Sequence, residues 1–121
     1  MSQLGRRTFL AAAGAAVAAR GANDRINVAV VGLRGRGRDH ISEYAAQRNC
    51  RIAAICDIDD AQTERAQALL RSLGREEARA YRDFRKLLED KELDAVSTAS
   101  PNHLHALQTI WACQAGKDVY V

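Results

Sequence analysis

The stretch INVAVVGLRGRGRDH, residues 26–40, places an apolar run directly before a loop with three glycines and three arginines. An apolar run of this length that closes with glycine is typical of a strand buried on both faces of a parallel sheet. The loop has the position of a G-x-G-x-x-G turn, but it reads Gly32-x-Arg34-x-x-Gly37, with arginine at the middle glycine. The loop by itself is therefore compatible with two interpretations, a cradle for phosphates or a basic turn between two elements.

Apolar runs and segments of helical spacing alternate through the rest of the chain. Strands are predicted at residues 26–32, 51–57, 79–81, 94–100 and 118–121, and helices at residues 38–48, 60–73, 83–89 and 103–115. Asp59 or Asp60 is the expected N-cap of the second helix, and Gly74 is expected to end that helix. Five strands joined by helices imply right-handed crossovers. The predicted fold class is therefore α/β, a doubly wound parallel sheet of the Rossmann type over residues 24–121.

An acidic residue at the end of the second predicted strand supports the phosphate-cradle interpretation. Asp57 follows Gly37 by twenty residues, where a carboxylate can accept hydrogen bonds from the ribose hydroxyls of adenosine. Gly32 permits a tight turn, Gly37 lets the helix pack close to the strand, and the helix N-terminus offers N–H groups to a pyrophosphate. Arg34 departs from the motif, because it replaces the middle glycine. Gly35 beside it can supply the missing room, and the guanidinium of Arg34 could pair with a phosphate. In the alternative interpretation the carboxylate is only a solvated strand-end acid, and the glycines only form a turn.

The composition indicates one globular domain. Apolar residues make up 47% of the 121 residues and charged residues 27%. The net charge of +3 arises locally, from arginine clusters at residues 6–7 and 34–38. A basic face interleaved with aromatic residues, which is typical of nucleic-acid binders, is not found in the sequence. We therefore expect no nucleic-acid partner.

Cysteine and histidine residues do not form a metal-binding pattern in this sequence. The three cysteines, Cys50, Cys56 and Cys113, have no C-x-x-C spacing and are expected to be free thiols. His103 and His105 form an H-x-H pair at a predicted helix start, but no third ligand is near them in sequence. We expect no metal site.

The first residues have the pattern of an export signal. GRRTFLAAAGAAVAA, residues 5–19, joins a basic start to a weakly apolar stretch of small residues, and its paired arginines resemble a twin-arginine signal. Cleavage is expected after Ala18 or Ala22. The stretch is too short and too rich in alanine for a stable membrane span. Residues 1–22 are thus interpreted as an export signal that directs the protein to the periplasm; the alternative is a frayed basic helix.

Four stretches of the sequence resemble one known family. They are VAVVGLRGRGRDH (residues 28–40), AICDID (54–59), YRDFRKLLEDKELDAVSTASPNHLHA (81–106) and AGKDVYV (115–121). Together they resemble the N-terminal domain of the Gfo/Idh/MocA oxidoreductases, which include glucose–fructose oxidoreductase and inositol dehydrogenase. The resemblance implies a Rossmann domain that binds NAD or NADP, followed by an α/β domain that binds substrate. It also implies hydride transfer to or from a hydroxyl of a sugar or cyclitol.

The resemblance also implies which residues bind the cofactor. The pyrophosphate would lie on the glycine loop, the adenosine ribose on Asp57, and the nicotinamide against the turn that follows the fourth strand. The expected cofactor-binding residues are Gly32, Leu33, Arg34, Gly35, Arg36, Gly37, Asp57, Ala99, Ser100, Pro101, Asn102 and His105. Asp57 would repel a 2′-phosphate, so NAD is favoured over NADP, although nearby arginines could receive that phosphate.

No catalytic residue is assigned within these 121 residues. In the family the catalytic lysine lies in an E-K-P motif directly after the strand that DVYV begins, beyond Val121. Lys117 precedes that strand and is expected to be solvated in a turn. We therefore expect the 121-residue chain to bind cofactor without turning over substrate, and a full-length enzyme to be a possible homo-oligomer. Two alternatives stay open: a relative that uses NAD to hydrolyse glycosidic bonds, and a dinucleotide-binding remnant without catalysis.

Overall fold

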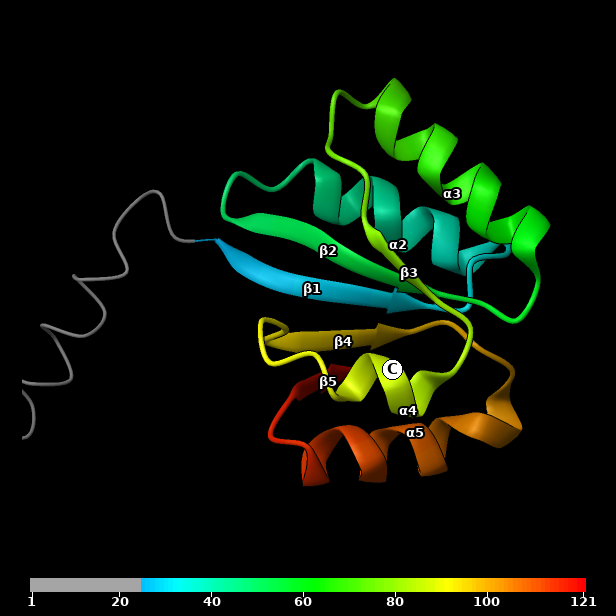
Figure 1. Ribbon diagram of the computed structural model, residues 1–121, viewed down its shortest axis with the longest axis vertical. Helices are drawn as coiled ribbons and strands as arrows, with labels where there is room; N and C mark the ends of the chain where they lie inside the picture. Colours follow the sequence, from blue (N-terminus) through cyan, green and yellow to red (C-terminus); the bar gives the residue numbers. More distant parts are fainter. Residues whose placement is uncertain (1–24) are drawn as a thin grey trace, which may run out of the picture.

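A computed structural model describes residues 25–121, which form a parallel sheet with helices on both faces (Figure 1). The sheet has the strand order β3-β2-β1-β4-β5. Its strands are β1 (Ile26–Val31), β2 (Cys50–Cys56), β3 (Arg79–Tyr81), β4 (Ala95–Thr98) and β5 (Asp118–Tyr120). The helices are α2 (Arg36–Ala45), α3 (Asp60–Ser72), α4 (Phe84–Leu88) and α5 (Asn102–Gln114). The predicted α/β class and doubly wound topology are confirmed.

Alternate residues of the central strand β1 enter two separate apolar cores. Val30 packs on the α2 and α3 face, with Ile41 of α2 and Leu70 of α3. Val31 packs on the opposite face, in a core that includes Leu87 of α4. Figure 1 shows the same division, with α2 and α3 on one side of the sheet and α4 and α5 on the other. The sequence of β1 is continuously apolar because both faces of this strand are buried.

Helix α2 is shorter at its C-terminal end than its sequence pattern predicts. The helix ends at Ala45, whereas the apolar spacing predicted a helix up to residue 48. The guanidinium of Arg75, from the chain that follows α3, donates to the carbonyl oxygens of Ala45 and Gln47. These carbonyls therefore have a partner outside the helix, and residues 46–49 turn the chain into β2.

The predicted cap and stop of α3 are confirmed. Asp59 has an extended backbone conformation, and its Oδ1 accepts a hydrogen bond of 3.0 Å from the N–H of Ala61. Gly74, which follows the C-cap, has a φ of 71°, a conformation that glycine adopts without strain.

Two glycines bring the start of α2 against the end of β1. Gly32 has a φ of 81°, and a Cβ atom added to it would lie 2.7 Å from the backbone nitrogen of Ser100. A Cβ atom on Gly37 would lie only 1.7 Å from the carbonyl oxygen of Gly32. No side chain fits at either position without moving backbone. The predicted tight turn and the predicted close packing of helix on strand are therefore both confirmed.

Gly37→Ala is expected to lower the free energy of unfolding by about 3 kcal/mol or more, because the methyl group meets backbone and not a flexible side chain. Gly74→Ala is the matched control, since its φ is also unfavourable for alanine but no atom lies near the added Cβ. The control is expected to cost about 1 kcal/mol. Urea unfolding followed by circular dichroism measures both values. Equal costs for the two variants would contradict the steric argument.

Candidate functional site

A cleft of about 290 Å³ lies at the carboxyl ends of the central strands. In open α/β sheets this edge is where ligands bind, because the chain changes direction there between the two faces. The cleft is formed by residues from the start of α2, the end of β4, the start of α5 and the end of β5. These residues are Arg36, His40, Thr98, Ala99, Ser100, Asn102, His105, Tyr120 and Val121.

The glycine loop presents unpaired backbone donors at the N-terminus of α2. Within residues 25–121, the N–H groups of Arg34, Gly35 and Arg36 have no hydrogen-bond acceptor. Gly35 occupies the N-cap position with a φ of 38°, and no side chain caps the helix. Free N–H groups at the positive end of a helix dipole form a favourable environment for an anion such as a pyrophosphate.

Asp57 joins the two loops that follow β1 and β2. Its Oδ2 accepts a hydrogen bond of 2.9 Å from the N–H of Leu33, and its Oδ1 accepts one of 2.9 Å from the N–H of Asp59. A carboxylate can accept about four hydrogen bonds, so these two contacts leave further capacity on both oxygens. The residue is half-buried and holds the glycine loop in place beside the start of α3.

Arg34 forms an ion pair across the same two loops. Its Nη2 lies 2.9 Å from Oδ2 of Asp59, although 74% of the arginine side chain is exposed. The guanidinium of Arg34 is the main cause of the lowered pKa of Asp59, and the N–H of Ala61 lowers that pKa further. The guanidinium is thus paired with a carboxylate of the protein, while the sequence suggested a phosphate as its partner.

Side chains of the turn between β4 and α5 bind one another. The Ser100 hydroxyl donates to Oε1 of Gln108, and Nε2 of His105 donates to the Ser100 carbonyl oxygen at 2.6 Å. The carbonyl can only accept, so this contact places the proton of His105 on Nε2. Pro101 occupies the N-cap position, and Asn102 is exposed at the start of α5. The turn is therefore preorganised, with the amide of Asn102 facing solvent.

His40 is buried beneath the cleft in a chain of hydrogen bonds. Its Nδ1 lies 2.8 Å from Oγ of Ser97, which also accepts a hydrogen bond of 3.1 Å from the Tyr44 hydroxyl. Burial is the main cause of the lowered pKa of His40, and the nearby charge of Arg36 adds to it. His40 is therefore a hydrogen-bonded packing residue that also lines the cleft. Its position in the wall of the cleft was not predicted.

Thr98, at the end of β4, carries the one buried side-chain polar atom without a partner in the described part of the chain. The residue is 2% exposed and belongs to the wall of the cleft. A buried hydroxyl without a hydrogen bond is costly, so most such groups in proteins have a partner. A ligand in the cleft would be placed to supply one.

The structure brings the predicted cofactor-binding residues to the carboxyl edge of the sheet, but only some of them line the cleft. Of the predicted set, Arg36, Ala99, Ser100, Asn102 and His105 line the cleft. Leu33 does not offer its side chain, because that side chain is 1% exposed and packs in the core with Ile41.

Sequence reasoning missed four residues of the cleft wall. They are His40, Thr98, Tyr120 and Val121. Two signals were available in the sequence. Thr98 places a hydroxyl at the end of a predicted buried strand, and His40 follows Arg36 by four residues, which places both on one face of α2.

Comparison with known proteins decides the family. The family model for an oxidoreductase family with an NAD-binding Rossmann fold, GFO_IDH_MocA, matches residues 26–121. The chain belongs to the Gfo/Idh/MocA oxidoreductase family.

Among the similar proteins are some whose names describe a glycosyl hydrolase or an inositol dehydrogenase. A glycosyl hydrolase family 109 protein of Stenotrophomonas maltophilia is 31% identical over 96% of this chain and 29% of its own length. The scyllo-inositol dehydrogenase of Lactobacillus casei, solved with NAD(H) and scyllo-inositol, has a TM-score of 0.68 and 27% identity over 78% of this chain. The myo-inositol dehydrogenase of the same organism, solved with NAD(H) and myo-inositol, has a TM-score of 0.67 and 29% identity over 78% of this chain. Each dehydrogenase match covers 27% of that structure's chain, so the chain spans less than a third of each of the three proteins.

By its family model this Gfo/Idh/MocA domain has an NAD-binding Rossmann fold, and the two inositol dehydrogenases were solved with NAD(H). Among residues 25–121, no group of three or more side chains is arranged to hold a metal ion. No helix in the same range is long and apolar enough to cross a membrane.

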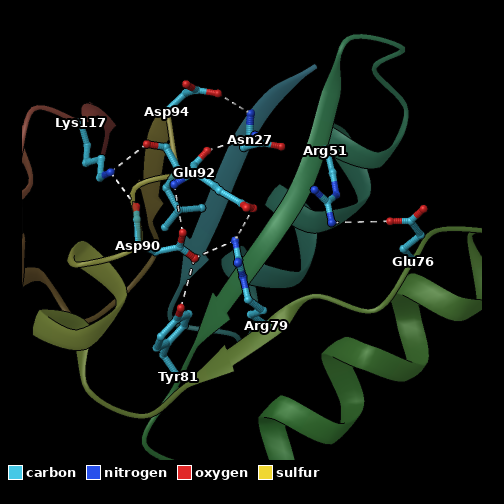
Figure 2. Close-up of polar contacts among 10 residues, drawn as sticks. Asn27, Arg51, Glu76, Arg79, Tyr81, Asp90, Glu92, Asp94 and Lys117 are labelled. Atoms are coloured by element: carbon cyan, nitrogen blue, oxygen red, sulfur yellow. Dashed lines mark hydrogen bonds and ion pairs between the residues drawn. The ribbon is translucent and has the colours of Figure 1, made fainter. Parts of the chain in front are cut away.

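The lysine of the family's A-G-K turn lies at the opposite edge of the sheet, where it has a structural role (Figure 2). Nζ of Lys117 donates to the carbonyl oxygens of Asp90 and Leu93, at 2.8 and 2.9 Å. Both carbonyls lie in the connection that enters β4 at its amino end. Lys117 lies in the turn before β5, as expected, but it is only partly exposed, because the packing of α5 and β5 brings its side chain onto these two carbonyl groups.

A buried carboxylate fastens the same connection to β3. The side chain of Asp90 is 5% exposed and lies 2.8 Å from Nη2 of Arg79. It also accepts a hydrogen bond of 3.1 Å from the Tyr81 hydroxyl, as Figure 2 shows. Burial raises the pKa of Tyr81, and the hydrogen bond to Asp90 raises it further. Lys117 and Asp90 together hold the amino edge of the sheet, while ligand binding belongs to the carboxyl edge.

Lys117→Met is expected to lower the free energy of unfolding by about 1–3 kcal/mol, because it leaves two part-buried carbonyls without their donor. Affinity for NADH should stay unchanged, since the cleft lies at the other edge. Lys86→Met is the matched control: Lys86 is exposed and should change stability by less than about 0.5 kcal/mol. Chemical denaturation and NADH titration measure both properties. A loss of NADH affinity without a loss of stability in Lys117→Met would place this lysine in the binding site.

Proposed function

We propose that this domain holds NAD for an oxidoreductase that transfers a hydride between the cofactor and a hydroxyl of a sugar or cyclitol. The substrate class rests on the names of the two similar inositol dehydrogenases, both of which exceed 25% identity to this chain. When bound, the nicotinamide ring would supply the hydride acceptor or donor. The residues described above would supply binding and orientation.

The described residues fit a dinucleotide along the carboxyl edge. The free N–H groups of Gly35 and Arg36 would bind the pyrophosphate, and the absence of a side chain at Gly37 keeps α2 close enough to present them. Asp57 has remaining acceptor capacity for the ribose hydroxyls of adenosine. At the far end of the cleft, the exposed amide of Asn102 is a candidate partner for the nicotinamide carboxamide.

The observation that carries the proposal is the unpartnered hydroxyl of Thr98. It is buried in the wall of the cleft, between the glycine loop and the start of α5. A purely structural threonine at the end of a buried strand would normally direct its hydroxyl to a carbonyl of its surroundings. Here the missing partner points to a polar group of the bound cofactor.

A second candidate is an NAD-dependent glycosidase, which the name of the Stenotrophomonas maltophilia relative favours. A dehydrogenase and an NAD-dependent glycosidase would use the same cofactor site in this domain, so only the net reaction distinguishes them. A dehydrogenase accumulates NADH in proportion to oxidised substrate, whereas a glycosidase releases its leaving group without net NADH. A chromogenic glycoside and a panel of free inositols and sugars, assayed with NAD on the whole protein that contains this domain, would separate the two. A third possibility, a dinucleotide-binding remnant, would bind NADH and be inactive in both assays.

We further propose that residues 1–22 export the protein to the periplasm by the twin-arginine route. These residues lie outside the part of the chain that the structure describes. The support is the paired Arg6 and Arg7 before a weakly apolar stretch. A route that carries folded proteins would suit a domain that acquires its cofactor in the cytoplasm.

Thr98→Val is expected to weaken NADH binding about three- to tenfold, because it removes one hydroxyl partner of the cofactor and leaves the shape of the side chain unchanged. Stability should stay equal or rise slightly, since the removed hydroxyl has no partner in the described part of the chain. Thr109→Val on α5, outside the cleft, serves as the control and should change neither property. Fluorescence titration with NADH and thermal unfolding give the two readouts. Unaltered NADH affinity in Thr98→Val, with the wild type binding NADH, would remove Thr98 from the site.

Replacing both Arg6 and Arg7 by lysine is expected to retain the protein in the cytoplasm, because the twin-arginine receptor reads the arginine pair and not the overall charge. Cell fractionation followed by immunoblotting measures the distribution. The control replaces Arg20 by lysine, which makes the same change outside the pair and should leave export intact. Periplasmic accumulation of the double variant would favour the general secretory route.

A further inference from the structure

We propose that the ion pair between Arg34 and Asp59 selects against a dinucleotide with a 2′-phosphate, and that Asp59 is therefore a specificity-determining residue of this domain. The inference rests on the proposed cofactor site, in particular on adenosine binding next to Asp57. The inference adds Asp59, which belongs neither to the glycine loop nor to the residues that the sequence predicted to bind the cofactor. Its basis is the position of the pair and the charges that surround it.

The pair lies between the loops that flank the adenosine side of the site. Arg34 occupies the position at which the usual motif has its middle glycine, and its Nη2 lies 2.9 Å from Oδ2 of Asp59. Asp59 is fixed from two other directions as well. Its N–H donates to Oδ1 of Asp57, and its own Oδ1 accepts from the N–H of Ala61. The guanidinium is therefore held by a carboxylate that cannot easily turn away.

The ion pair engages Arg34, so the guanidinium of this residue is not free to receive a 2′-phosphate. Such a phosphate would lie near Asp57, whose carboxylate accepts from the ribose hydroxyls in the NAD form. Asp59 adds a second negative charge two residues along the chain and engages Arg34, whose planar fork is well suited to a phosphate. Arg82, the other guanidinium at this loop, donates to the carbonyl oxygen of Ile58 and to Oδ2 of Asp60. Arg34 and Arg82 are thus both engaged by acceptor groups of the protein, while the carboxylates of this region would still repel a 2′-phosphate.

The same geometry implies that Asp59 can be changed without unfolding the domain. The ion pair is largely solvent-exposed, and exposed pairs contribute little to stability. Asparagine is as good an N-cap as aspartate, so Asp59→Asn keeps the hydrogen bond from the N–H of Ala61. The substitution removes one negative charge and releases Arg34 to meet a phosphate.

The test compares NADH and NADPH affinities by fluorescence titration of the 121-residue chain. Wild type should bind NADH and bind NADPH at least tenfold more weakly. Asp59→Asn should tighten NADPH binding about tenfold and change NADH affinity less than about threefold, since one charge pair at an exposed site is involved. Adding Arg34→Gln to Asp59→Asn should abolish the gain.

Glu64→Gln on α3 is the matched control, because it removes one negative charge and releases neither Arg34 nor Arg82. It should tighten NADPH binding less than threefold. No gain in NADPH affinity for Asp59→Asn, an equal gain for Glu64→Gln, or a gain that persists without Arg34 would each overturn the inference. NADH binding by wild type would leave the proposed function in place. Wild type that binds neither nucleotide would overturn the proposed function itself.

Discussion

Helix α2 can begin where it does only because Gly37 has no side chain. A Cβ atom at this position would lie 1.7 Å from the carbonyl oxygen of Gly32, so any other residue would push the helix away from the end of β1. The close approach fixes the glycine loop, directs the free N–H groups of the helix start to the cleft, and places His40 and Arg36 in its wall. A second close approach, of Gly32 to the backbone of Ser100, brings together the turns after β1 and β4. The carboxyl edge of the sheet is thus organised around a single missing methyl group.

The two edges of the sheet have different tasks, and their polar residues differ accordingly. At the amino edge, Asp90 and Lys117 are engaged by protein groups and fasten the connections between strands. At the carboxyl edge, the helix start and Thr98 leave donors without partners among residues 25–121. Unpaired polar groups are unfavourable within a protein alone and favourable where a ligand completes them. This contrast locates the ligand edge independently of any motif.

Asp57 has both a structural and a binding aspect. It accepts the N–H groups of Leu33 and Asp59, and so it sets the distance between the glycine loop and the start of α3. The same carboxylate is the one whose position suits a ribose. Arg34, which fills a position usually held by glycine, is accommodated because its side chain leaves the loop toward Asp59. Arginine in place of the usual glycine is therefore compensated by the carboxylate of Asp59, two residues after Asp57.

The sequence by itself determined the order of strands and helices along the chain, a cap at Asp59 or Asp60 and the turn at Gly32, because these depend on local periodicity, caps and backbone conformations that few residues adopt. It also indicated the edge at which the site lies, since parallel strands place their carboxyl ends together. Only the tertiary structure decided which residues meet in the cleft. His40 reaches it because α2 packs against the sheet, where the side chain of His40 is hydrogen-bonded to Ser97 of β4. Lys117 finds its two hydrogen-bond acceptors because α5 brings it over carbonyl groups that are 24 and 27 residues earlier in the chain. Contacts of this kind depend on how elements far apart in sequence are stacked, and no local pattern encodes them.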